Sequence, residues 1–272
     1  MSLNSEKEII LEAKNLVKTY TQSSGRFGFG QTQIRALDHV SVALKSGTTL
    51  AVVGESGSGK STLARCLLQL QTFDGGEVIF AGQNLAQLDK QALRAIRKNL
   101  QMVFQDPFAS LNPRMRVGEI IGEGLLIHSI GSASEQKNKV LQMLERVGLN
   151  AEDALKFPHQ FSGGQRQRIG IARALVLQPK VVVCDEPVSA LDVSVQAQIL
   201  LLLKDLQREM NLSYVFISHD LRVVRHIADE MVVLHQGKIV EQGRVIDIYN
   251  APQQIYTQQL LNAIPGRSAA LN

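Results

Sequence analysis

Cysteine is nearly absent from this sequence. The chain of 272 residues holds two cysteines, Cys66 and Cys184. They lie far apart in the chain, and each sits in a hydrophobic stretch, which favours buried free thiols over a disulfide or a thiolate metal site. We therefore expect two reduced thiols in the interior.

Long hydrophobic runs are also missing. The longest apolar run, Ile199–Leu203, is closed by Lys204, whereas a helix that spans a bilayer needs about 20 apolar residues. The first ten residues, MSLNSEKEII, carry charges where a signal peptide needs an apolar stretch. The sequence thus predicts a chain that does not cross a membrane by itself and stays in the cytoplasm.

A strong charge of one sign is absent as well. The chain has 29 basic and 25 acidic residues, a net charge of +4, and no long basic run. This small surplus gives no support to nucleic-acid binding. The composition, 44% hydrophobic and 20% charged, is that of an ordinary globular protein. The length fits one large domain or a domain with an inserted subdomain.

The first hundred residues alternate strands with short helices. A glycine-containing segment from Thr21 to Thr32 predicts a surface loop. The elements expected around it are strands at 9–16, 34–44, 49–53, 77–80 and 100–104, and a helix at 60–70.

The rest of the chain inserts helices and then resumes the alternation. Residues 117–157 predict helices only, with Ser132 and Glu135 forming a capping box. The elements expected afterwards are helices at 164–176 and 192–210, and strands at 181–184, 214–217, 231–234 and 238–240. We therefore expect an α/β fold with a β-rich opening layer and an inserted helical subdomain.

A glycine-rich loop follows the strand at 49–53 and opens a helix. Its sequence from Gly54 to Ser61 matches G-x-x-x-x-G-K-S. Glycines let successive backbone N–H groups turn toward phosphate oxygens, and the helix N-terminus adds partial positive charge. Lys60 is then expected to reach the β- and γ-phosphates, and the Ser61 hydroxyl to bind Mg²⁺.

A second apolar strand, 181–184, ends in two acids. In a protein that binds nucleotide phosphates, Asp185 is placed to hold Mg²⁺, directly or through water. Glu186 is placed to orient the attacking water or to act as its general base. The pair is weak support alone and becomes strong together with the glycine-rich loop.

Four further segments make the pattern specific. They are Phe161–Gln165 (FSGGQ), Gln105 in VFQDP, Ser189–Asp192 (SALD) and His219 in ISHD. With the glycine-rich loop and the acidic pair, they resemble the ATP-binding subunits of ABC transporters, in that family's order. The spacing of 185 − 162 = 23 positions between Ser162 and Asp185 is also the family's. The resemblance covers about residues 8–265.

The resemblance implies a fold and a division of the chain. The fold is a P-loop NTPase domain of the ABC type, with an N-terminal antiparallel β layer and an inserted helical subdomain. The ABC ATPase domain is expected at 1–265, its catalytic core at about 8–105 and 178–245, its helical signature subdomain at about 106–177, and a short C-terminal helical tail at 246–272.

The resemblance also implies roles for single residues. Gln105 is expected to contact Mg²⁺ or water, and His219 the γ-phosphate. Ser162 to Gln165 offer hydroxyl and N–H donors at a helix start, and in the family they face the nucleotide held by a partner subunit. Tyr20 is expected to stack on adenine, with Phe27 and Phe29 as alternatives. The full nucleotide-binding set is Tyr20, Gly54, Glu55, Ser56, Gly57, Ser58, Gly59, Lys60, Ser61, Thr62, Ser162, Gly163, Gly164, Gln165 and Asp192.

Four longer stretches resemble one branch, the ATPases of dipeptide, oligopeptide and nickel importers. They begin at Val53, Gln105, Phe157 and Asp185, and the Leu111-Asn-Pro run is the most telling. The branch implies a second ATPase subunit, identical or paralogous, two membrane permease subunits and an extracytoplasmic substrate-binding protein, with the ATPase on the cytoplasmic face of the membrane.

The cysteine count excludes one cofactor, and the sequence leaves two alternatives to an importer open. With two cysteines, a four-thiolate iron–sulfur cluster like that in the tail of many members of the branch cannot form in one chain. The alternatives to an importer are a soluble ABC ATPase acting on nucleic acid or ribosomes, and an exporter subunit. The chain has neither the inserted coiled coil nor the duplicated cassette of such soluble relatives.

Overall fold

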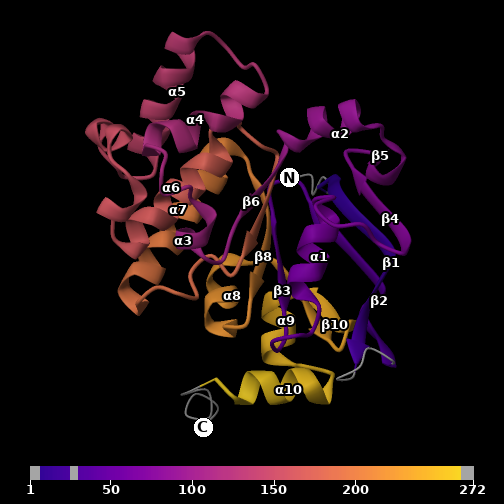
Figure 1. Cartoon of the computed structure of the whole chain (residues 1–272). Coiled ribbons are helices and arrows are strands. Elements are labelled where there is room, and N and C mark those ends of the chain that lie inside the picture. Colours follow the sequence, from indigo (N-terminus) through magenta and orange to yellow (C-terminus); the bar gives the residue numbers. More distant parts are fainter. Residues whose placement is uncertain (1–6, 25–29, 265–272) are drawn as a thin grey trace, which may run out of the picture. The chain divides into compact units, whose positions relative to one another are not determined.

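The computed structural model describes residues 7–24 and 30–264 (Figure 1). The chain forms two compact units, which are described separately. The first unit comprises residues 1–88 and 215–272, and the second comprises residues 89–214. The boundaries of the helical subdomain expected from the sequence differ from these limits and stay a prediction.

The first unit opens and closes the chain. Its elements are β1 (Ile9–Ser24), β2 (Gly30–Lys45), β3 (Thr49–Val53), α1 (Lys60–Leu67), β4 (Gly75–Phe80), β5 (Gln83–Asn84), the 3₁₀ turn η1 (Leu85–Gln87), β8 (Ser213–Ser218, which begins in the second unit), α8 (Leu221–Ile227), β9 (Glu230–His235), β10 (Lys238–Arg244), α9 (Val245–Asn250) and α10 (Ile255–Asn262).

The opening β layer is an antiparallel sheet in the order β2-β1-β4-β5. Strands β1 and β2 pair from Ile9↔Lys45 out to Ser24↔Gly30. The loop predicted from Thr21 to Thr32 is therefore wrong at both ends. The hairpin continues through polar residues, so no apolar alternation marks it in the sequence.

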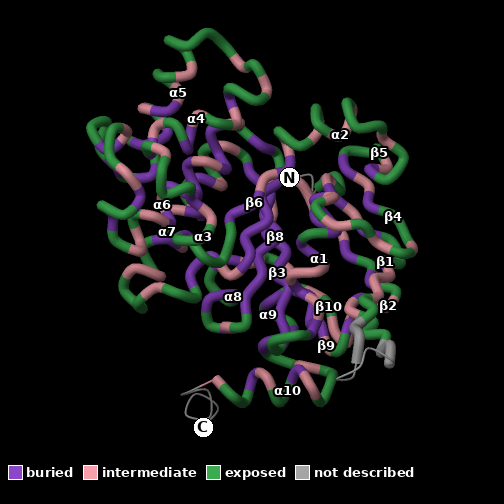
Figure 2. Tube along the Cα trace, viewed as in Figure 1, coloured by how far each residue is buried: buried purple, intermediate pink, exposed green. Residues whose placement is uncertain are grey.

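A second group of strands in the first unit runs in the order β10-β9-β3-β8. Strand β3 is parallel to β9, and β9 is antiparallel to β10. Every residue of β3 and β8 is buried, as the purple tube in Figure 2 shows. The two apolar runs predicted there are thus strands buried on both faces.

Helices α8, α9 and α10 complete the interior of the first unit. Leu221, Tyr249 and Leu261 come from these three helices and pack into one cluster with Ala51 and Val53 of β3. Leu261 is fully buried. The end of the described chain is therefore anchored on the strand that leads into the glycine-rich loop.

The second unit is mainly helical. Its elements are α2 (Lys90–Arg97), β6 (Leu100–Val103), α3 (Pro107–Ser110), α4 (Val117–Ile127), α5 (Ala133–Arg146), the 3₁₀ turns η2 (Ala151–Leu155) and η3 (Pro158–Gln160), α6 (Gly163–Leu175), β7 (Val181–Asp185) and α7 (Val193–Met210).

The helical insertion predicted over 117–157 is confirmed by α4, α5 and the following turns. At the start of α5 the predicted capping box is present: the Ser132 hydroxyl accepts from the Glu135 N–H, and the Glu135 carboxylate accepts from the Ser132 N–H at 2.6 Å. Strands β6 and β7 are parallel, with Leu100 paired to Val181 and Val103 to Cys184.

Both cysteines are free and fully buried, as expected. Cys66 lies on α1 in the first unit, and Cys184 lies in β7 in the second. Burial raises the pKa of the Cys66 thiol to about 11 and that of Cys184 further. Both therefore remain protonated and inert at neutral pH.

No helix within residues 7–24 and 30–264 is both long and apolar enough to cross a membrane.

Candidate active site

The glycine-rich loop connects β3 to α1 in the first unit, as predicted. Gly54, Gly57 and Gly59 have φ angles of 150°, 80° and 108°. Gly59 is the N-cap of α1, and Lys60 is the first residue of that helix. The loop thus delivers its backbone to the helix N-terminus, where N–H groups lack intrahelical partners and favour an anion.

Two of these glycines also leave no room for a side chain. A Cβ at Gly54 would lie 2.1 Å from the Leu234 carbonyl oxygen, and one at Gly59 would lie 2.3 Å from that of Ala36. Backbone oxygens cannot swing aside as a flexible side chain can. The close fit of the loop against β2 and β9 therefore requires glycine at both positions.

Lys60 is buried within the loop that precedes it. Its side-chain nitrogen donates to the carbonyl oxygens of Gly54, at 2.8 Å, and Glu55, at 2.7 Å. The residue is only 5% exposed. The loop therefore surrounds the ammonium group with its own backbone, close to the start of α1.

Tyr20 lies beside the same helix start. Its hydroxyl oxygen is 3.5 Å from the Thr62 hydroxyl oxygen and accepts a hydrogen bond from the Gln71 side chain. Tyr20 lies within β1, which continues past it to Ser24. Its ring is partly exposed. The alternatives Phe27 and Phe29 lie outside the described residues.

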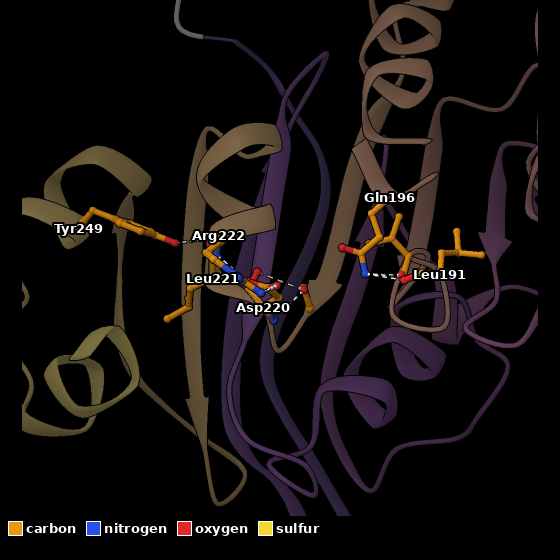
Figure 3. A network of polar contacts seen from close by, with 8 residues as sticks. Leu191, Gln196, Asp220, Leu221, Arg222 and Tyr249 are labelled. Atoms are coloured by element: carbon orange, nitrogen blue, oxygen red, sulfur yellow. Dashed lines mark hydrogen bonds and ion pairs between the residues drawn. The ribbon is translucent and has the colours of Figure 1, made fainter. Parts of the chain in front are cut away.

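His219 lies in the turn between β8 and α8, as predicted, and is exposed. The next residue, Asp220, caps α8 by accepting from the Arg222 N–H. Its carboxylate also takes two hydrogen bonds from the Arg222 guanidinium, which hold the pKa of Asp220 below its usual range. Figure 3 shows this pair at the start of α8. The turn that carries His219 is thus fixed by a charged cap.

In the second unit, parallel strands β6 and β7 bring Gln105 and Glu186 together. The Gln105 side-chain amide donates to the Glu186 carboxylate at 3.2 Å. Glu186 has φ 45°, an unusual angle for a residue with a side chain. Asp185, at the end of β7, is 5% exposed. Of the two acids, Asp185 is thus buried, and the carboxylate of Glu186 is held by Gln105.

The signature segment, Phe161–Gln165, leads into helix α6. Ser162 is the N-cap: its hydroxyl accepts from the Gln165 N–H at 3.3 Å, and the Gln165 side chain accepts from the Ser162 N–H at 3.0 Å. A Cβ at Gly164 would lie 2.5 Å from a methyl group of Val195. The start of α6 therefore packs closely against the start of α7.

The segment Ser189–Asp192 precedes α7 and is fixed at both ends. Asp192 caps α7 by accepting from the Val195 N–H at 2.9 Å, and hydrogen bonds from Ser194 and Val195 lower its pKa. The Gln196 side-chain amide donates to the carbonyls of Val188 and Leu191, the second of which Figure 3 shows. The segment is thus a turn held by hydrogen bonds, next to the start of α6.

Some contacts at these segments are not visible in the sequence. In α6, the Arg166 side chain donates to the backbone carbonyl of Pro158. The Arg168 side chain of the same helix donates to the backbone carbonyl of Val147. Both contacts tie the helix to the segments before it. Gln196 has no motif of its own. Tyr256, in the C-terminal helix α10, contacts Glu55 of the glycine-rich loop across 201 positions. No local pattern marks these residues.

The sequence of this chain matches a known protein family. A family model described as ABC transporter matches residues 37–189, more than half of the chain. The chain belongs to the ABC transporter family. The resemblance inferred from the motifs is thereby confirmed.

Curated ABC transporter relatives extend the match to nearly the whole chain. The dipeptide transport ATP-binding protein DppF of Haemophilus influenzae is 53% identical over 98% of this chain and 81% of its own length. The oligopeptide transport ATP-binding protein AppF of Bacillus subtilis is 49% identical over 95% of this chain and 79% of its own length.

A solved ABC structure confirms the predicted fold. It is a dimeric post-hydrolysis state of the ATP-binding cassette MJ0796 bound to ADP and Pi, with a TM-score of 0.77 and 31% identity over 87% of this chain and 99% of that chain. The α/β fold of the ABC ATPase type, with its antiparallel sheet and helical insertion, is therefore established for this chain.

Proposed function

We propose that this chain is the ATP-hydrolysing subunit of an ABC importer that takes up peptides or a related small solute. The observation that supports it most is the 53% identity with a dipeptide transport ATP-binding protein over 98% of the chain. The glycine-rich loop supplies the matching chemistry, since its backbone and Lys60 form a polyphosphate site at the start of α1.

Lys60 and the loop Gly54–Thr62 bind the phosphates of ATP. Lys60 moves its ammonium from the loop carbonyls to the β- and γ-phosphate oxygens. By the family resemblance, the Ser61 hydroxyl, the Asp185 carboxylate and the Gln105 amide oxygen would hold Mg²⁺, and each is an oxygen ligand of the kind that this ion prefers. When bound, Mg²⁺ neutralises charge on the phosphates during transfer.

Hydrolysis then needs a positioned water. Glu186 accepts a proton from that water or orients it, and Gln105 fixes the Glu186 carboxylate through the hydrogen bond between them. His219 contacts the γ-phosphate from its exposed turn. Positioning and electrostatic stabilisation supply the catalysis, and no covalent intermediate forms.

Two copies, identical or paralogous, form the working dimer. The exposed N-terminus of α6 at Ser162–Gln165 faces the nucleotide of the partner subunit, and Asp192 lies beside it. ATP binding closes the dimer, and hydrolysis reopens it. The dimer sits on the cytoplasmic face of the membrane beneath two permease subunits, with a substrate-binding protein on the other side.

Replacing Tyr20 by alanine should weaken ATP affinity by about 5- to 150-fold, because stacking of a base on an aromatic ring is worth about 1–3 kcal/mol. Tyr20→Phe keeps the ring and should bind like the wild type. Calorimetric titration of both variants with ATP measures this. Equal affinity of the alanine variant and the wild type would remove Tyr20 from the adenine site.

The importer assignment is tested by isolating the tagged chain from its native membrane and identifying co-purified proteins by mass spectrometry. We expect two membrane permeases and an ATPase subunit. The same extraction with the untagged chain controls for adventitious binding. Ribosomes or nucleic acid without permeases would contradict the importer and favour the soluble ABC class, leaving the ATPase assignment in place.

A further inference from the structure

The C-terminal helix α10 of the first unit touches the glycine-rich loop. Tyr256, the second residue of α10, accepts a hydrogen bond on its hydroxyl oxygen from the backbone N–H of Glu55 at 3.2 Å. Its ring lies against the imidazole of His235, at the end of β9, with ring centroids 3.9 Å apart. The hydroxyl is therefore directed at the loop by a ring that is itself packed.

The Glu55 residue is held on both sides. While its N–H donates to Tyr256, its carbonyl accepts from the side-chain nitrogen of Lys60, at 2.7 Å, and from the N–H of Ser58, at 3.2 Å. One residue thus links the hydroxyl of Tyr256 to the ammonium of Lys60. The peptide groups on either side of the Glu55 Cα thus take part in both contacts.

Helix α10 is firmly seated on the strand that leads into the loop. Leu261 is fully buried in the cluster that contains Ala51 and Val53 of β3, and Tyr256 packs against that cluster. Burial raises the pKa of the Tyr256 hydroxyl, so it is protonated and uncharged at neutral pH. The same interior therefore fixes both the start of the loop and the group that contacts it.

We propose that Tyr256 is a positioning residue for the phosphate loop: its hydroxyl holds Glu55, and through it Lys60, in the conformation that binds the phosphates of ATP. The inference rests on the proposed role of this loop as the ATP site. A loop with three glycines at positive φ has wide conformational freedom, and a preset contact reduces the ordering cost of binding.

Loss of the Tyr256–Glu55 contact should weaken ATP binding rather than slow the hydrolysis step. If loss of the contact lowers the population of the binding-competent loop, the apparent dissociation constant rises by the same factor. Once ATP occupies the loop, the phosphates themselves order it. The turnover rate at saturating ATP should then be unchanged.

Tyr256→Phe tests this, because it removes the hydroxyl and keeps the ring against His235. We expect the KM and the dissociation constant for ATP to rise about 3- to 10-fold, the range that one hydrogen bond supplies, with kcat unchanged. Hydrogen exchange of the segment 54–61 in the nucleotide-free chain should be faster than in the wild type.

Tyr249→Phe is the matched control. Its hydroxyl donates to the Leu221 carbonyl, which also belongs to the first unit. It should lower the melting temperature without raising the KM for ATP or the exchange rate of 54–61. A melting temperature for each variant separates loss of stability from loss of affinity.

Unchanged KM in Tyr256→Phe overturns the proposal, whether or not the melting temperature falls, and so does unchanged exchange of the loop. Failure of the proposed function looks different, since the wild-type chain itself would then neither bind nor hydrolyse ATP. The exchange measurement needs no nucleotide, so it decides in that case whether Tyr256 holds the loop.

Discussion

Replacing Glu186 by glutamine should lower ATP hydrolysis by about 10²- to 10⁴-fold, the range that a general base supplies, and leave ATP binding intact. Glutamine has nearly the same shape, and its side-chain oxygen can still accept the hydrogen bond from Gln105. The variant therefore keeps the geometry and removes the group that accepts the proton. It also removes a negative charge, which does not weaken the binding of an anionic ligand.

Phosphate release at saturating Mg-ATP and a calorimetric titration with ATP check the two halves of this prediction. Glu77→Gln is the matched control, because it makes the same change on an exposed residue of β4, far from the motifs in sequence. Hydrolysis near the wild-type rate in Glu186→Gln would exclude Glu186 as the base. Loss of binding in this variant would show that the carboxylate supports the site's structure.

The motif segments could be predicted because their information is local. The loop at Gly54–Ser61, the helix start after Ser162 and the turn at His219 each depend on residue types within a few positions. Helix caps and glycine turns are decided by nearby backbone geometry, so the sequence alone places them correctly.

Other features could not be predicted because they depend on distant partners. The hairpin between β1 and β2 extends to Ser24 and Gly30 through polar residues whose pairing is set by the whole strand pair. The positive φ of Glu186 and the contact between Tyr256 and Glu55 likewise arise from tertiary packing. In the sequence, nothing near Tyr256 in the helix Ile255–Asn262 points to the glycine-rich loop.

There is a physical reason why the polar motif residues lie at strand ends. Gln105 follows β6 and Asp185 ends β7, two parallel neighbours whose carboxyl ends meet at one edge of their sheet. The strands are buried and rigid, whereas the turns that follow are free to carry polar groups. The interior thus provides stability, and the strand ends provide the reactive groups.

Gly59 and Gly57 belong to one loop and should differ in how they tolerate alanine. Gly59→Ala should destabilise the first unit by about 2–5 kcal/mol, because it adds a side chain at φ 108° and brings its Cβ to 2.3 Å from the Ala36 carbonyl oxygen. If the loop shifts to relieve this collision, the N-terminus of α1 is no longer presented to phosphate. ATP affinity should then fall by about 100-fold or more, since a displaced loop loses several charge-assisted hydrogen bonds at once.

Gly57→Ala makes the same chemical change in the same loop at φ 80°, where no atom lies within 4 Å of the added Cβ. Its cost should be the backbone strain alone, about 1–2 kcal/mol. Thermal unfolding and ATP titration of the two variants separate collision from strain. Equal losses in both would show that the close approach to Ala36 does not determine the conformation of the loop, and that the need for glycine there is only a matter of φ.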